Sequence, residues 1–134
     1  MGTWGHRNFE NDAALDFVNE VEDNGIDVIE DTIQRVANLP EEDYLEDDDS
    51  ASVLAAIEFI AAAKGNQSED FPESAEEWLG KTNPAALLSH ERTQLTKIIE
   101  RVKNNSGLRD AWQEEGDEPT EWLAVLSDLE KRVS

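Results

Sequence analysis

The sequence contains no cysteine. A disulfide framework, a thiolate nucleophile and a cysteine-based zinc or iron–sulfur site are therefore excluded. The two histidines, His6 and His90, do not stand at the spacing of a zinc-binding pair, and His90 is expected to be solvent-exposed near the start of a helix. Neither a Gly-x-Ser-x-Gly nucleophile motif nor a glycine-rich phosphate loop occurs. We therefore expect no cofactor, no tightly bound metal and no enzymatic activity.

Long hydrophobic runs are also missing. The longest mainly apolar stretch, Ala51 to Ala63, is interrupted by Ser52 and Glu58, and it is shorter than the ~20 residues that a membrane-spanning helix needs. The opening residues, Met1 to His6, have neither the basic nor the apolar region of a signal peptide. We therefore expect no transmembrane segment and a cytoplasmic location.

Positive charge is scarce and unevenly placed. The chain has 11 Lys and Arg against 32 Asp and Glu, which gives a formal net charge of -21. Residues 1–83 hold 22 acidic and 4 basic side chains, a net charge of -18, whereas residues 84–134 have a net charge of -3. Such a charge repels nucleic acid and anionic membranes and attracts basic proteins. The composition therefore favours a basic protein as the partner.

Despite this charge, the sequence predicts a folded helical protein. A hydrophobic fraction of 38% and four tryptophans are too many for a disordered acidic chain. Apolar residues recur at spacings of three and four from Leu15 onward, and an alternation of period two is nowhere sustained over the length of a strand. We predict an all-α, compact single-domain bundle over residues 1–134, with six or seven helices around a buried alanine-rich central helix.

Capping residues and helix breakers predict the helix boundaries. Asn11 is the predicted N-cap of a helix over residues 12–23, and Gly25 follows its end. A second helix is predicted over residues 27–38, and the central helix over residues 51–64 with Ser50 as its cap. Prolines, glycines and capping residues predict the other helices: Pro72 to Gly80, Asn83 and Pro84 onward with a break at Ser89, Ser106 to near Gly116, and Pro119 to the C-terminus.

Glu58 is the most informative polar residue, because it lies in the middle of the least polar predicted helix. An ionised carboxylate buried without a partner costs several kcal/mol, so Glu58 needs donors, a cation or a proton. The favoured interpretation is a structural polar site in which Glu58 accepts hydrogen bonds from the N-terminal loop, including the Trp4 indole, close to Asn11, Asp12 and Asp16 at the start of the first helix. The alternative joins Asp12, Asp16 and Glu58 as an oxygen-ligand metal site or an acid/base pair.

The densest acidic run spans residues 41–49. Like charges at this density repel one another, which predicts an exposed loop. The run has no glycine, which a calcium-binding EF-hand loop needs at its sixth position, so a defined calcium site is not expected. We predict that its acidic residues form the surface that meets a basic partner: Glu41, Glu42, Asp43, Glu46, Asp47, Asp48 and Asp49.

Three blocks of sequence carry a family resemblance: MGTWG at residues 1–5 with FENDAALDF at 9–17, AAIEFIAAAKG at 55–65, and SGLRDAW at 106–112 followed by Trp122. Together they resemble a bacterial family catalogued as domain of unknown function 4259. One departure is Arg7, where the family pattern usually has glycine. The resemblance covers most of the chain and implies no particular activity.

The favoured function is that of a macromolecular binding or inhibitor protein of the immunity type, which masks a basic surface on its partner. The first alternative is a metal-dependent enzyme or metal-binding protein that uses Asp12, Asp16 and Glu58. The second alternative is a soluble structural domain in which the acidic residues have no partner.

Overall fold

A computed structural model describes residues 7–40, 42–83, 85–113 and 119–133. Within these residues the chain forms helices and no strand, so the predicted all-α class is confirmed. Six helices have eight or more residues, and two shorter ones, α5 and α7, complete the set. The helices in chain order are α1 (Asp12–Asn24), α2 (Ile26–Ala37), α3 (Asp47–Ala63), α4 (Glu73–Gly80), α5 (Ala85–Leu88), α6 (Arg92–Asn104), α7 (Gly107–Gln113) and α8 (Thr120–Arg132).

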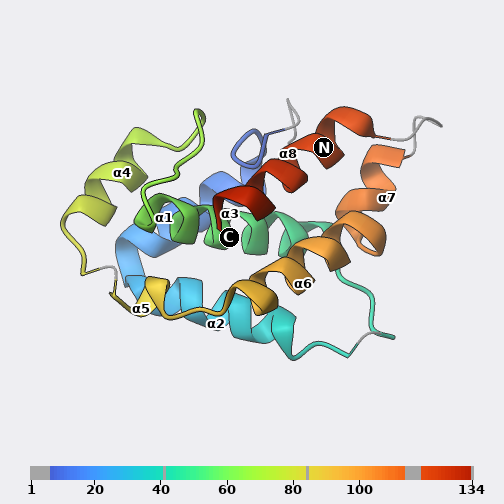
Figure 1. The fold of residues 1–134 in the computed structure, drawn as a ribbon, viewed down its shortest axis with the longest axis horizontal. Helices are drawn as coiled ribbons and strands as arrows, with labels where there is room; N and C mark the ends of the chain where they lie inside the picture. The colour runs from blue at the N-terminus through green and yellow to red at the C-terminus, as the bar shows by residue number, and fades with distance from the viewer. Residues whose placement is uncertain (1–6, 41, 84, 114–118, 134) are drawn as a thin grey trace.

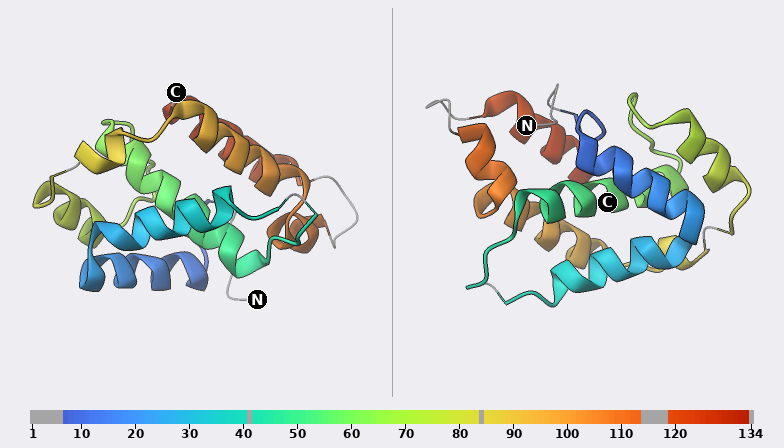
Figure 2. Two further views of the ribbon diagram at one scale, coloured as in Figure 1. Left: turned by 90° about the horizontal axis from the view of Figure 1, so that it is seen from below. Right: turned by 180° about the vertical axis from the view of Figure 1, so that it is seen from behind.

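Helix α3 runs through the middle of the molecule and contacts every other described helix (Figure 1). The helices α1 and α2 pack side by side against one side of it, and α6 and α8 pack against each other and against α3 (Figure 2). Residues 53–61 of α3 are all buried. The prediction of a central alanine-rich helix that is apolar on nearly all sides is therefore confirmed. None of the described helices is both long and apolar enough to cross a membrane.

Local signals at a few helix ends agree with the capping pattern of the sequence. The Asn11 side chain accepts a hydrogen bond from the Ala14 N–H at 2.8 Å, as expected of an N-cap. Gly25 follows α1 with a φ of 86°, a conformation that favours glycine. The chain breaks between α5 and α6 at Ser89, and the Ser106 Oγ accepts from the Arg109 N–H at 3.1 Å at the start of α7. The predicted end of this helix near Gly116 lies outside the described residues.

The start of the central helix was predicted wrongly. Helix α3 begins at Asp47 rather than Ala51, and Ser50 is buried inside it, where its Oγ donates to the Glu46 carbonyl at 2.8 Å. Asp47, Asp48 and Asp49 therefore form the first helical turn instead of an exposed loop. The prediction weighed their mutual repulsion, but the dipole and free N–H groups of a helix N-terminus attract carboxylates and outweigh it.

A cluster of aromatic rings anchors the N-terminal loop to the core. Phe9 meets Phe71 edge to face, and Phe71 meets Phe59 of α3 in the same way, with ring centroids 5.5 and 5.3 Å apart. Trp78 of α4 contacts Phe59 with a centroid distance of 5.6 Å. The loop that contains Asn8 is thereby fixed beside the middle of α3, which positions the site described next.

Candidate functional site

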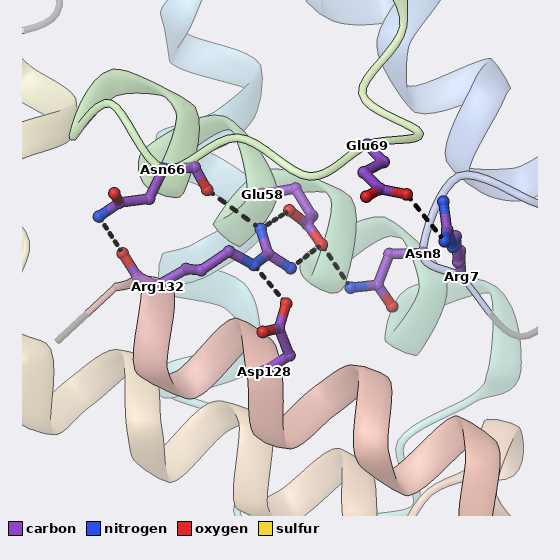
Figure 3. A network of polar contacts seen from close by, with 7 residues as sticks. All are labelled: Arg7, Asn8, Glu58, Asn66, Glu69, Asp128 and Arg132. Carbon is purple, nitrogen blue, oxygen red and sulfur yellow. Dashed lines mark hydrogen bonds and ion pairs between the residues drawn. The ribbon is translucent and has the colours of Figure 1, made fainter.

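The carboxylate of Glu58 lies at the centre of a polar network inside the bundle (Figure 3). Its side chain is 1% exposed. Arg132 of α8 donates to both oxygens, from Nη1 to Oε1 at 2.6 Å and from Nη2 to Oε2 at 3.0 Å. The Asn8 Nδ2 donates to Oε2 at 2.7 Å. The bidentate geometry and the third donor satisfy a charge that would otherwise be very costly to bury.

The same arginine fastens the end of α8 to the rest of the bundle. The Arg132 Nε donates to Asp128 Oδ2 at 2.7 Å, and its Nη1 also contacts the Asn66 carbonyl at 3.3 Å. In return, Asn66 Nδ2 donates to the Arg132 carbonyl at 3.0 Å, and Lys64 Nζ donates to the Val133 carbonyl at 2.7 Å. Residues at the end of α3 thus satisfy two carbonyls that the last turn of α8 leaves free.

The environment of Arg132 acts on its pKa in two directions. Partial burial lowers the pKa, since it disfavours the charged form. The hydrogen bond to Glu58 and the charge of that carboxylate raise the pKa, as Asp128 also does, and they outweigh the burial. The pKa of Arg132 is therefore raised above its usual value, and the guanidinium remains charged in its partly buried position.

The predicted polar site differs from the observed network in its members. Glu58 is bound by the N-terminal loop through the side-chain amide of Asn8, while Trp4 lies outside the described residues. Asn11 joins indirectly, because its Nδ2 donates to the Asn8 carbonyl at 3.2 Å. Sequence reasoning missed Arg132, which is 74 residues from Glu58. The sequence indicated only that a buried acid needs donors, a cation or a proton, and this does not identify Arg132.

The structure does not bring Asp12 and Asp16 to Glu58. Both aspartates are exposed on α1, whereas Glu58 is buried and bonded to Arg132. Among the described residues, no group of three or more Asp, Glu or His side chains is arranged to hold a metal ion. The metal-site interpretation of these three acids therefore has no geometric support in the structure.

His90 was expected to be exposed, and this expectation is wrong. Its side chain is 6% exposed, and its Nε2 lies 2.7 Å from Glu30 Oε2 of α2. The residue precedes α6 in sequence, but the packing of the chain against α2 covers it. Position near a helix start could not reveal this, because the burial comes from a neighbouring helix.

Helix α1 presents an exposed acidic face. Four exposed carboxylates follow one another at spacings of four, four and three residues along this helix, which puts them on one face: Asp12, Asp16, Glu20 and Asp23. Residues 8–34 contain no Lys or Arg. In the part of the chain that the structure describes, no Lys or Arg forms an ion pair with a carboxylate of α1. Within the described residues, the charge of this face is therefore uncompensated.

The acidic run of residues 41–49 is divided between a loop and a helix. Glu42, Asp43 and Glu46 are exposed ahead of α3, and Glu41 lies outside the described residues. Within the first turn of α3, Asp49 forms an ion pair with Arg35 at 3.2 Å. We call residues 42–46 the acidic segment.

The Arg7 backbone shows how the chain accommodates the departure from the family pattern. The described residues include Arg7, and among them only glycines have a positive φ. Its N–H donates to Glu10 Oε1 and its guanidinium pairs with Glu69 Oε2, both at 3.1 Å. An arginine therefore fits this loop without backbone strain.

Comparison with known proteins agrees with the resemblance noted in the sequence. Residues 2–125 match the family model described as Domain of unknown function (DUF4259), and the chain belongs to this family. No curated protein and no solved structure matches the chain. The family match ends before Asp128 and Arg132, so the cation that pairs with Glu58 lies beyond the matched residues.

Proposed function

We propose that the protein binds a basic protein and masks its positive surface with the acidic face of α1, with the acidic segment 42–46 as a second contact. The observation that supports this most is the uncompensated charge of α1. Its acidic side chains are exposed, and no described Lys or Arg forms an ion pair with them. Opposite charge on a partner would remove the repulsion among them.

Most of the charges on α1 act against the helix that carries them. Asp12 is the exception, because it lies in the first turn, where the helix dipole favours a carboxylate. Like charges at i and i+4, as in Asp12 with Asp16 and Asp16 with Glu20, destabilise an isolated helix by about 0.2–0.5 kcal/mol per pair. Asp23 adds a negative charge near the C-terminus, where the helix dipole disfavours it, and the last turn has no basic residue. A structural role therefore does not account for this pattern.

Solubility alone is a weaker explanation, since a net charge with a magnitude of about 2–8 normally suffices for a small domain. The chain carries -21. A negative surface of this strength accelerates association with a cationic partner by electrostatic steering, and salt screens the effect. These properties are typical of inhibitor proteins that cover a basic partner, and nucleic acid would be repelled.

Affinity capture with matched variants tests the proposal. Three triple variants each remove three exposed carboxylates and make the net charge less negative by the same amount: D16N/E20Q/D23N on α1, E42Q/D43N/E46Q in the acidic segment, and E73Q/E76Q/E77Q on α4. We refer to them as the α1, segment and α4 variants. With native lysate at low salt, the wild type and the α4 variant should capture the same basic protein, and the α1 variant should lose it.

Association kinetics with the captured protein then separate binding through charge from adventitious capture. The on-rate should fall steeply with salt for the wild type and should be lower for the α1 variant at every salt concentration. A smaller reduction is expected for the segment variant. Equal capture by all four proteins, or an on-rate indifferent to salt, would contradict the proposal and leave solubility as the explanation of the acidic residues.

A further inference from the structure

The acidic segment displays an aromatic side chain. Tyr44 is 52% exposed, and only one other large hydrophobic side chain among the described residues, Leu88 at 45%, is comparably exposed. Tyr44 is also the single tyrosine of the chain. Large aromatic rings are normally buried or at least partly covered, so an exposed ring that is held in place is a candidate contact residue.

Several contacts hold the backbone around Tyr44 in place. The Arg101 guanidinium of α6 donates to the carbonyls of Leu39, Pro40 and Asp43 at 2.6, 2.8 and 2.8 Å. The next residue after the tyrosine, Leu45, is buried, and its carbonyl accepts from the Gly107 N–H at 2.7 Å. The loop is therefore fixed on both sides of the exposed ring.

Helix α7 approaches the loop so closely that only glycine fits at its first residue. A Cβ atom at Gly107 would lie 2.6 Å from the Asp47 backbone nitrogen and 3.1 Å from the Tyr44 hydroxyl. The Tyr44 hydroxyl donates to Asp110 Oδ2, also of α7, at 2.9 Å. The ring is thus oriented before any partner arrives, which reduces the entropy lost on binding.

The surroundings of the ring are negatively charged. The hydrogen bond to Asp110 raises the pKa of Tyr44 above its ordinary value of 10, with smaller contributions from desolvation and from the charges of Asp110, Glu46 and Asp47. The phenol is therefore neutral at physiological pH. A neutral aromatic face beside several carboxylates matches a planar cation, which can stack on the ring and donate two hydrogen bonds to a carboxylate.

We infer that Tyr44 is an anchor for an arginine side chain of the basic partner, held between the exposed ring and the neighbouring carboxylates of Glu46 and Asp47. This inference rests on the proposed function and adds the residue type that the partner presents. Lysine is the less suitable cation, because its ammonium group has no planar face to stack and no fork for bidentate pairing.

Two peptides of equal charge test the anchor. Protein labelled with ¹³C-tyrosine gives one ring environment, because Tyr44 is the only tyrosine. Titration with octa-arginine should shift the ring signal, and octa-arginine should bind about threefold tighter than octa-lysine in the wild type. Calorimetry provides the affinities. In Y44A the arginine preference should be clearly reduced, whereas Y44F, which keeps the ring, and L88A, which removes the other exposed large hydrophobic side chain, should retain it in full.

The outcomes distinguish this inference from the proposed function. Salt-dependent binding of both peptides to the wild type with equal affinity, or an arginine preference that is as large in Y44A as in the wild type, would overturn the anchor and leave the proposed function standing. If the captured basic protein in turn binds the wild type and Y44A with the same dissociation rate, the anchor is also wrong. Loss of capture by the α1 variant, in contrast, concerns only the proposed function.

Discussion

Removal of the charge of Arg132 should destabilise the protein more than removal of the charge of Glu58. R132M keeps the aliphatic part of the side chain and deletes the guanidinium, which leaves a carboxylate that is 1% exposed with Asn8 as its remaining donor. E58Q deletes the negative charge and leaves a guanidinium that is 15% exposed and still bonded to Asp128. The guanidinium that E58Q leaves behind can reach water, whereas the carboxylate that R132M leaves behind cannot.

The magnitudes follow from this difference in burial. Breaking a buried ion pair from one side costs about 3–5 kcal/mol when the remaining charge stays buried, which we expect of R132M. E58Q should cost about 1–3 kcal/mol, because it weakens the hydrogen bonds with the Arg132 guanidinium, which can still be partly hydrated. The double variant E58Q/R132M contains neither charge and should be more stable than R132M alone.

Urea denaturation followed by tryptophan fluorescence measures these differences, since Trp122 is buried in α8 close in sequence to Arg132. D128N is the matched control: it removes another carboxylate from the same arginine, but Asp128 is 63% exposed and should contribute less than about 1 kcal/mol. If R132M is too unstable to purify, R132K, which keeps the charge and loses the bidentate fork, should still show a clear loss. Equal effects of E58Q and R132M, or strictly additive effects in the double variant, would refute the reasoning.

Three further predictions concern other parts of the chain. G107A should lower the free energy of unfolding by about 1–3 kcal/mol, because the added Cβ would overlap the Asp47 backbone nitrogen; thermal unfolding of G107A beside G80A, where no atom lies within 4 Å, checks this. The Tyr44 phenol should ionise above pH 10, and D110N should move the midpoint back toward 10, as an NMR pH titration of the single tyrosine will show. Because the folded pKa is raised, the neutral phenol contributes to stability at lower pH, and this contribution is lost as the pH rises through the folded pKa. The α1 variant should be more stable than the wild type by about 0.5–1 kcal/mol at low salt, and a loss of stability in chemical denaturation would show that the α1 acids support the fold.

Local sequence signals predicted the parts of the structure that depend on neighbours along the chain. Asn11 and Gly25 delimit α1 because capping and left-handed conformations involve only the adjacent turn. The burial of residues 53–61 followed from their composition, and the burial of Glu58 followed from its position among them. Such features need no knowledge of the tertiary arrangement.

Features that depend on packing between distant segments could not be predicted in the same way. Arg132 reaches Glu58 only because α8 lies against α3, and a buried acid alone does not identify its counterion among eleven Lys and Arg. His90 is covered by α2, which is about 60 residues earlier in the chain. The anchoring of the acidic segment by Arg101 likewise required the fold, since three backbone carbonyls carry no sequence signature.

The two acidic regions show why charge density alone does not identify a binding surface. Asp47, Asp48 and Asp49 look like the strongest candidate in the sequence, yet they occupy the first turn of α3, where the helix dipole favours them. Their replacement should therefore weaken the helix as well as any contact, so a loss of binding in such a variant would be ambiguous. The acids of α1 are more dispersed in sequence. Apart from Asp12 in the first turn, they oppose the stability of the helix, because successive carboxylates repel one another and Asp23 lies near the C-terminus. A variant of α1 that gains stability and loses its partner would separate the two effects, because a general disturbance of the fold lowers both.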